Sequence, residues 1–233
     1  MTNESDFHFV LGAVIRYYGD GGEVEIPPTA ERIGGDIFKG NETITSVIIP
    51  PSVKKISREA FYKCKNLKKI VFSEGLECID DHAFYSCDSL TEIVIPDSVT
   101  EIGTQAFCGC KNLLSVKLGN GLKRLNSGAF SMCFSLVSLD LGNSVEEIGS
   151  LCFQYCNQLK SVKIPASLNY LTYGTFNDCD SLTSVEFENA DGWYIKAPRD
   201  EVWLPIDATD PEKNATVLRG PWMSWSLGNP NAK

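Results

Sequence analysis

Apolar positions recur along this chain with a fixed period of 23 residues. Two columns of residues keep that spacing: Phe38, Phe61, Phe84, Phe107, Phe130, Phe153 and Phe176, and Cys64, Cys87, Cys110, Cys133, Cys156 and Cys179. A period of this length is typical of a solenoid, because one repeat is too small to bury its own apolar side chains and must stack on its neighbours.

Each repeat predicts two short extended segments. Residues 67–72 have apolar side chains at their first, fourth and sixth positions, and residues 90–95 and 159–164 repeat the arrangement. The last two of these apolar positions alternate as in a strand with one buried face, so we expect equivalent strands to stack in parallel. Pro or Gly then turns the chain, as at Pro96 and Gly142, and a second extended piece follows at residues 53–56 and 99–102.

The rest of the repeat predicts a tight return. Residues 59–64 suit a single helical or 3₁₀ turn, which would bring Ala60, Phe61 and Cys64 to the interior side. The phenylalanine column is therefore the predicted core. Equivalent cysteines in stacked turns point the same way rather than toward one another, so we expect buried, reduced thiols instead of disulfides.

The repeat pattern resembles a known family. The order Ile-Pro-x-Ser-Val-x-x-Ile-Gly-x-x-Ala-Phe-x-x-Cys-x-x-Leu, complete at residues 95–113, is similar to the bacterial leucine-rich repeats of the BspA type. The resemblance covers seven repeats, residues 26–186. Its departures are Asn41 in place of the first Cys, and Cys152 and Thr175 in place of the Ala before Phe.

The predicted fold is a leucine-rich-repeat solenoid, right-handed, with seven 23-residue repeats of stacked parallel β-strands and short 3₁₀ or irregular returns. Residues 1–25 would form an N-terminal cap, with a strand and turn over residues 7–22, and residues 187–233 a C-terminal cap. In the second cap Asp210, Pro211 and Gly220 are suited to begin and end a helix.

Four tryptophans fall in the C-terminal cap: Trp193, Trp203, Trp222 and Trp225. They admit two interpretations. Large aromatic side chains can seal the apolar end of the last repeat, and we favour this role. A group of aromatic rings could also stack on a sugar.

Composition narrows the chemistry. A net charge of -9 without a Lys/Arg cluster argues against binding to nucleic acid or to anionic membranes. The sequence contains no apolar run long enough to insert into a membrane, and its first residues lack the basic character of a secretory signal. The two histidines, His8 and His82, have no catalytic motif around them. Two pairs of thiols are close in sequence, Cys108 with Cys110 and Cys152 with Cys156. In each pair the second thiol already belongs to the buried cysteine column, so it is not free to bind a metal. We therefore expect no catalytic residue, cofactor or metal.

The exposed side of the first strand holds the candidate partner-binding face. Residues flanking its central buried position form two rows, Ser46, Lys69, Glu92, Ser115, Ser138, Ser161 and Ser184, and Ile48, Val71, Val94, Lys117, Asp140, Lys163 and Glu186. One interpretation is that the charges neutralise one another across adjacent strands. The other is that Ile48, Val71 and Val94 form an exposed apolar strip beside a serine lane that accepts a peptide or glycan.

These observations favour a non-enzymatic module that binds a protein or a glycan. The resemblance to BspA-type proteins implies a cell-surface or extracellular adhesion role, with host extracellular matrix as a candidate partner. The alternative is a cytoplasmic scaffold or spacer with no ligand on the strand face. We expect a monomer in either case.

Overall fold

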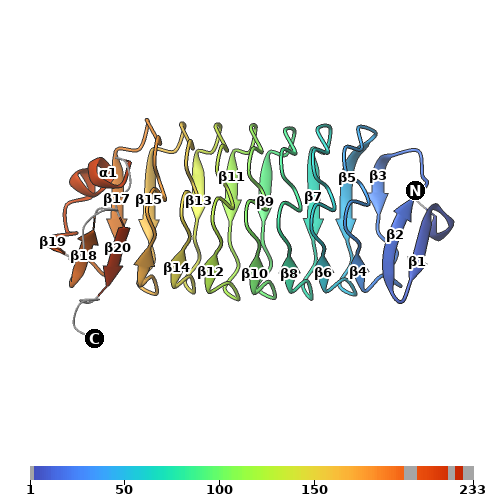
Figure 1. Ribbon diagram of the computed structural model, residues 1–233, viewed down its shortest axis with the longest axis horizontal. Coiled ribbons are helices and arrows are strands. Elements are labelled where there is room, and N and C mark those ends of the chain that lie inside the picture. Colours follow the sequence, from blue (N-terminus) through green and yellow to red (C-terminus); the bar gives the residue numbers. More distant parts are fainter. Residues whose placement is uncertain (1–2, 197–203, 220–223, 228–233) are drawn as a thin grey trace.

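The computed structural model describes residues 3–196, 204–219 and 224–227, and it is an elongated stack of turns (Figure 1). Each 23-residue repeat contributes one longer strand and one short strand, on two separate sides of the stack. A hairpin lies at the N-terminal end, and a helix beside three short strands lies at the C-terminal end. The leucine-rich-repeat solenoid predicted from the sequence is confirmed.

The longer strands form the strand face. They are β3 (Gly22–Glu25), β5 (Ile44–Ile49), β7 (Lys69–Phe72), β9 (Glu92–Val94), β11 (Ser115–Lys117), β13 (Ser138–Asp140), β15 (Ser161–Ile164) and β17 (Ser184–Phe187). They pair in parallel within three separate sheets, β3-β5-β7, β9-β11-β13 and β15-β17. Partners in the register are 23 residues apart, as for Val47 opposite Ile70 and Ser115 opposite Ser138.

The short strands form a second, continuous sheet. They are β4 (Arg32–Ile33), β6 (Lys55–Ile56), β8 (Cys78–Ile79), β10 (Glu101–Ile102), β12 (Arg124–Leu125), β14 (Glu147–Ile148) and β16 (Tyr170–Leu171). Strands of both caps extend this sheet to twelve strands, from β1 (Phe7–Val10) at one edge to β19 (Leu204–Ile206) at the other. Each short strand buries its second residue, so both sides of every turn contribute to one core.

The return is irregular rather than helical. Amides alternate between two kinds of acceptor: Tyr62 donates within its own turn, to the Glu59 carbonyl at 3.0 Å, whereas Phe61 donates to the Ala83 carbonyl of the next turn at 2.8 Å. This alternation requires a left-handed backbone at Glu59 and Lys63, both with φ of 57°, and equivalent positions repeat it along the stack. A 3₁₀ helix would direct every amide to the third residue back and leave none for the next turn.

The phenylalanine column is the centre of the core. Its seven rings are 0 or 1% exposed, and neighbouring rings stack with centroids 4.8 to 5.7 Å apart. The amides of the first six column phenylalanines donate to carbonyls of the next turn, and Cys152 and Thr175 supply these carbonyls to Phe130 and Phe153. Because the acceptor is a backbone oxygen, these two departures from alanine leave the ladder intact.

The N-terminal cap is a hairpin, not the single strand expected over residues 7–18. Strands β1 (Phe7–Val10) and β2 (Ala13–Tyr17) pair antiparallel after the short 3₁₀ helix η1 (Glu4–Asp6). The chain reverses at Leu11 and Gly12, whose φ values of 49° and 75° suit a two-residue hairpin turn. Tyr17 lies 5.1 Å from Phe38, centroid to centroid, and so covers the first ring of the column.

The C-terminal cap contains the predicted helix, α1 (Pro211–Arg219), and the strands β18 (Trp193–Lys196), β19 (Leu204–Ile206) and β20 (Ser224–Leu227). The Asp210 carboxylate accepts from the amides of Glu212 and Lys213, both at 3.1 Å, so the predicted N-cap is confirmed. Gly220 lies outside the described residues. The buried Asn214 side chain donates to the carbonyls of Val185 and Ala208 and thereby ties the helix to the last repeat strand.

Candidate functional site: the strand face

The two rows expected on the strand face point outward in the structure. Ile48, Val71 and Val94 are 42, 37 and 49% exposed, large values for β-branched side chains. Most of the polar members are exposed as well: Lys69, Glu92, Lys117, Ser138, Asp140, Ser161, Lys163 and Glu186, while Ser46, Ser115 and Ser184 are half-buried. Strand pairing places Ile48 beside Val71, and Val94 beside Lys117. Their role in binding stays a prediction.

Most charges in the two rows form no direct ion pair in the described part of the chain. Among the described residues, Lys69, Glu92, Lys117 and Asp140 take part in no ion pair within 4.0 Å. Lys163 pairs with Glu188, at 2.9 Å, rather than with Asp140 or Glu186. Its hydrogen bond to Glu188 raises the pKa of Lys163 and lowers that of Glu188. Direct ion pairs between adjacent strands therefore do not hold these four charges in place.

The strand face is interrupted between β7 and β9, where one sheet ends and the next begins. A hollow of about 470 Å³ lies over this seam. Its lining includes Val71 and Val94 and the half-buried ring of Phe72, which packs edge-on against Phe84. An adjoining hollow of about 480 Å³ reaches Ile48. The apolar strip thus lines two neighbouring depressions, which share Lys68, Lys69 and Val71.

A third row of outward side chains was not anticipated from the sequence. It consists of Thr45, which lies inside β5, and of the residues directly before the six following strands, Lys68, Thr91, Leu114, Val137, Lys160 and Thr183. Lys68 and Thr91 line the same hollow as Val71 and Val94, so this row belongs to the same surface. Leu114 and Val137, 48 and 53% exposed, occupy positions that are polar in the other repeats. These two apolar residues at otherwise polar positions are the sequence signal from which this part of the surface could have been predicted.

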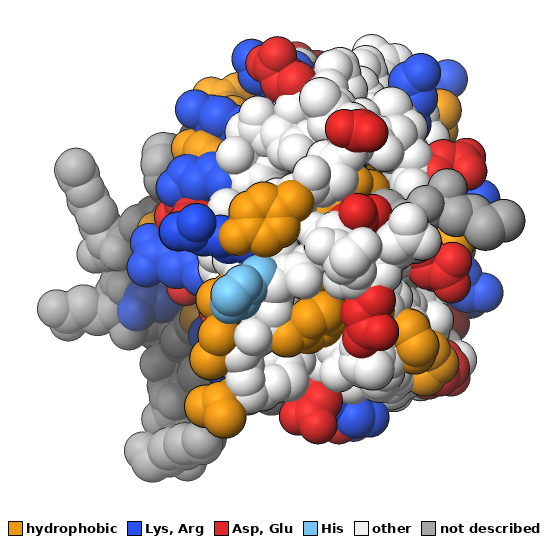
Figure 2. All heavy atoms as spheres, turned by 90° about the vertical axis from the view of Figure 1, so that its right-hand side faces the viewer, with side chains coloured by type: hydrophobic (Ala, Val, Ile, Leu, Met, Phe, Trp, Pro, Cys, Tyr) orange, Lys and Arg blue, Asp and Glu red, His pale blue; other side chains and the backbone are white. Residues whose placement is uncertain are grey.

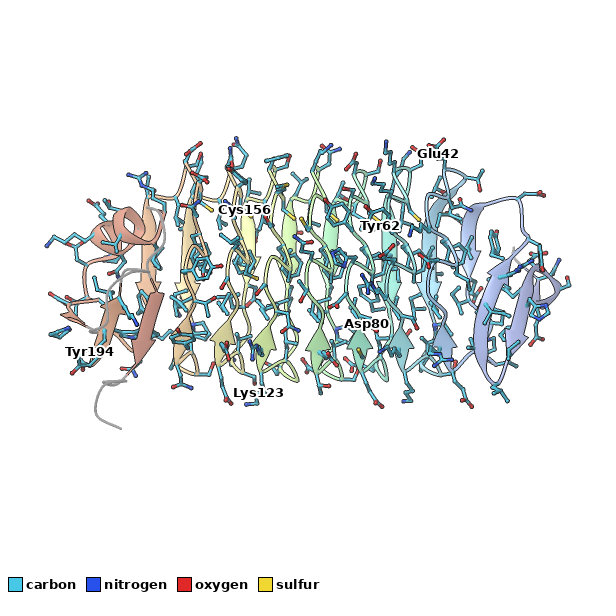
Figure 3. The ribbon with its side chains drawn as sticks, in the orientation of Figure 1. Glu42, Tyr62, Asp80, Lys123, Cys156 and Tyr194 are labelled. Atoms are coloured by element: carbon cyan, nitrogen blue, oxygen red, sulfur yellow. The ribbon has the colours of Figure 1, made fainter. Side chains whose placement is uncertain are left out.

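The thiols serve the core. Each column cysteine donates through Sγ to the carbonyl of the column phenylalanine in the preceding turn, at 2.9 Å for Cys64 to Phe38 and 3.1 Å for Cys87 to Phe61. Sulfur atoms, Cys156 among them, lie in a row inside the stack (Figure 3). All nine cysteines lie in the described part of the chain and are free thiols, eight of them buried. Six therefore act as small apolar side chains that also satisfy a backbone carbonyl.

Burial should make these thiols slow to react. Burial is the largest cause that raises the pKa of the half-buried Cys78 to about 12, and the nearby Glu101 carboxylate is the second. Burial also raises the pKa of Cys108 to about 11. Because a raised pKa lowers the thiolate fraction, iodoacetamide at pH 8 should label native Cys78 on the order of a thousandfold more slowly than a free thiol. Peptide mass spectrometry measures this rate, which should rise about tenfold per pH unit from pH 8 to 10. Denatured chain, labelled at all nine positions, is the control; rapid native labelling at pH 8 would contradict the assignment.

Two of the other candidate groups, His82 and Trp193, contact neighbouring side chains. His82 Nε2 lies 2.9 Å from Gln105 Oε1, and His8 is exposed on β1. Trp193 is 1% exposed and packs edge-on against Phe187, as expected for a seal. Trp203 and Trp222 lie outside the described residues. In the described residues no group of three or more His, Cys, Asp or Glu could hold a metal ion, and no helix is long and apolar enough to cross a membrane.

Comparison with known families agrees with the repeat geometry. The model of the BspA type leucine rich repeat region matches residues 20–94 and 77–192, in six copies. This chain belongs to the BspA-type leucine-rich repeat family. The resemblance drawn from the pattern at residues 95–113 is thereby confirmed. A search of the curated proteins found no match to this chain.

Two solved structures are similar over much of the stack. A leucine rich cell surface protein from Faecalibacterium prausnitzii is 26% identical, with a TM-score of 0.72, over 87% of this chain and 57% of that one. A leucine rich repeat protein from T. pallidum is 30% identical, with a TM-score of 0.54, over 68% of this chain and 90% of that one. This BspA-type chain thus spans little more than half the length of the first. The family and these neighbours indicate a repeat module of the binding type.

Proposed function

We propose that this BspA-type solenoid is a non-enzymatic module that binds a protein partner on its strand face, in an adhesion role at the bacterial cell surface. The observation that carries the proposal is the exposed apolar strip of Ile48, Val71 and Val94, which lines two adjoining hollows. Exposed apolar side chains grouped around a depression are typical of contact surfaces. The same positions in the next four repeats hold charged residues, so the strip is local.

A protein suits this surface better than a glycan. Sugars are held chiefly by exposed aromatic faces, whereas the strip is aliphatic and Phe72, the aromatic residue in its hollow, is half-buried. A location at the cell surface is supported by the similar structure from F. prausnitzii, which is described as a cell surface protein. Host matrix proteins are therefore the first partners to test, with glycans as the second class.

Replacing Val71 and Val94 together by Asp should reduce affinity for such a partner at least tenfold. Each substitution places a charge in the apolar part of the contact, where its desolvation is unfavourable. The measurement is surface plasmon resonance against immobilised matrix proteins, with a glycan array in parallel. Both valines are exposed, so the variant should fold and melt like the original chain.

The matched control is the double variant Val10→Asp, Ile15→Asp. The side chains of Val10 and Ile15 are 46 and 40% exposed and lie on the N-terminal hairpin, at an end of the molecule that carries scattered apolar side chains (Figure 2). The two substitutions add the same charge as those at Val71 and Val94. The control variant should bind like the original chain. A partner that binds equally to both double variants, or the absence of any partner, would instead favour the scaffold or spacer.

A further inference from the structure

The hydrogen bonds between turns are not equally complete on the two sides of the stack. On the strand face, the amide of the third row donates to the preceding turn, from Lys68 to the Thr45 carbonyl and from Leu114 to the Thr91 carbonyl, both at 2.8 Å. Among the described residues, the equivalent amides of Thr91 and Lys160 make no such bond. These gaps define two seams, the first between β7 and β9 and the second between β13 and β15, where one sheet ends and the next begins.

The other end of the strands shows the same two interruptions. Ile95 donates to the Lys117 carbonyl of the next turn at 2.9 Å, whereas the equivalent amides of Phe72 and Leu141 form no such bond in the part of the chain that the structure describes. Each seam therefore lacks backbone hydrogen bonds at both ends of its strands.

The opposite side of the stack is continuous at the same turns. Strands β8 and β10 pair in parallel across the first seam, and β14 and β16 pair across the second. Thr100 donates to the Glu77 carbonyl at 2.9 Å, and Asn169 donates to the Glu146 carbonyl at 2.8 Å. Neighbouring turns are thus joined along the short-strand sheet and open along the strand face.

Other contacts restrain the two seams. At the second seam the column rings of Phe130 and Phe153 are 5.7 Å apart, the widest spacing between neighbours in the column. At the first seam the Glu74 carboxylate accepts from the amides of Asp97 and Ser98, at 3.2 and 3.1 Å, and so bridges two turns just beyond the strand ends. A side chain and ring packing here take the place of a backbone ladder.

We propose that the solenoid bends at these two seams, with the continuous short-strand sheet as the hinge, so that the strand face opens and closes as three blocks. A parallel ladder holds neighbouring strands about 4.8 Å apart, and its loss on one side alone leaves that side free to separate. The hollow over β7 and β9 lies on the first seam, so its width changes as the stack bends. Bending requires no partner, and it can be tested independently of the proposed function.

Pairs of nitroxide spin labels in the outward row that begins with Ser46 test this bending. The pairs are Ser46→Cys with Glu92→Cys, Glu92→Cys with Ser138→Cys, and Ser138→Cys with Ser184→Cys, and each spans two turns, about 10 Å. The first pair crosses the first seam, the third crosses the second seam, and the middle pair lies within one sheet as the matched control. All carry Cys78→Ser, because the other native thiols are buried.

Continuous-wave EPR measures the distance distribution of each pair. The distribution should be at least about twice as wide for both seam pairs as for the control pair. Glu74→Ala should widen it further at the first seam and leave the control pair unchanged, because the substitution removes the bridge between the turns.

Equal widths for the three pairs would overturn the proposal. A longer but equally narrow distance across the seams would overturn it too, because it describes a static gap, and so would broadening at only one seam. Should circular dichroism show that a labelled pair disturbs folding, the second row offers pairs of the same spacing and the same relation to the seams, at Ile48, Val94, Asp140 and Glu186.

Discussion

Replacing Phe107 with alanine should lower the free energy of unfolding by about 3 to 5 kcal/mol. The ring is fully buried and stacks on Phe84 and Phe130, with centroids 5.1 Å away on each side. Truncation would leave a cavity in the middle of the column, where two neighbouring turns lose contact at once. Urea denaturation followed by circular dichroism measures the change.

A matched control is Phe134→Ala. This residue undergoes the same truncation, but its side chain is 38% exposed and lies outside the column. Its cost should stay under about 1 kcal/mol, since little buried contact is lost. If Phe107→Ala also costs less than about 1 kcal/mol, the column does not hold the turns together as described.

Replacing Trp193 with alanine should cost a similar amount, about 3 to 5 kcal/mol, but at the C-terminal end. Its indole is buried, lies 4.8 Å from the Phe187 ring and donates through Nε1 to the Asn189 carbonyl at 2.7 Å. Because each turn of a solenoid contacts only its neighbours, removing the seal should loosen the last repeats first. Hydrogen exchange monitored by mass spectrometry would locate the loss in β17 and α1.

The conservative variant Trp193→Phe separates packing from the hydrogen bond. It keeps an aromatic ring against Phe187 and removes the indole donor, so its cost should be smaller, about 1 to 3 kcal/mol. A sugar-stacking role makes the opposite forecast, in which Trp193→Ala leaves stability unchanged and abolishes binding on a glycan array. That pattern would overturn the assignment of Trp193 as a seal.

Much of this fold could be predicted from the sequence because the repeat is short and regular. Phe107 and Cys110 recur at the same spacing in every neighbouring turn, and only a stack can bury such a column. The strand positions followed from alternation, and the helix after Asp210 followed from its cap. The outward direction of Val71 and Val94 followed in the same way, since their neighbours along the strand must be buried.

Other features depend on contacts between turns, which a repeat pattern does not contain. The return at Glu59 and Lys63 is not a 3₁₀ turn, because alternate amides bond to the next turn. The charges of Lys69 and Glu92 do not pair although they are in adjacent turns, since the sheet is interrupted between β7 and β9. Neither the hydrogen bonding of the return nor the missing ion pair alters the 23-residue spacing of any residue type, so neither can be detected from the repeat pattern.

By itself, the sequence determined the period, the buried columns and the outward rows of the strand face, because each is a property of one repeat multiplied along the chain. Only the tertiary structure decided where the strand face opens, which of its charges remain unpaired, and that Leu114 and Val137 share a surface with Val71 and Val94. These features arise from how neighbouring turns meet, and the backbone geometry between turns is set by the packed stack as a whole.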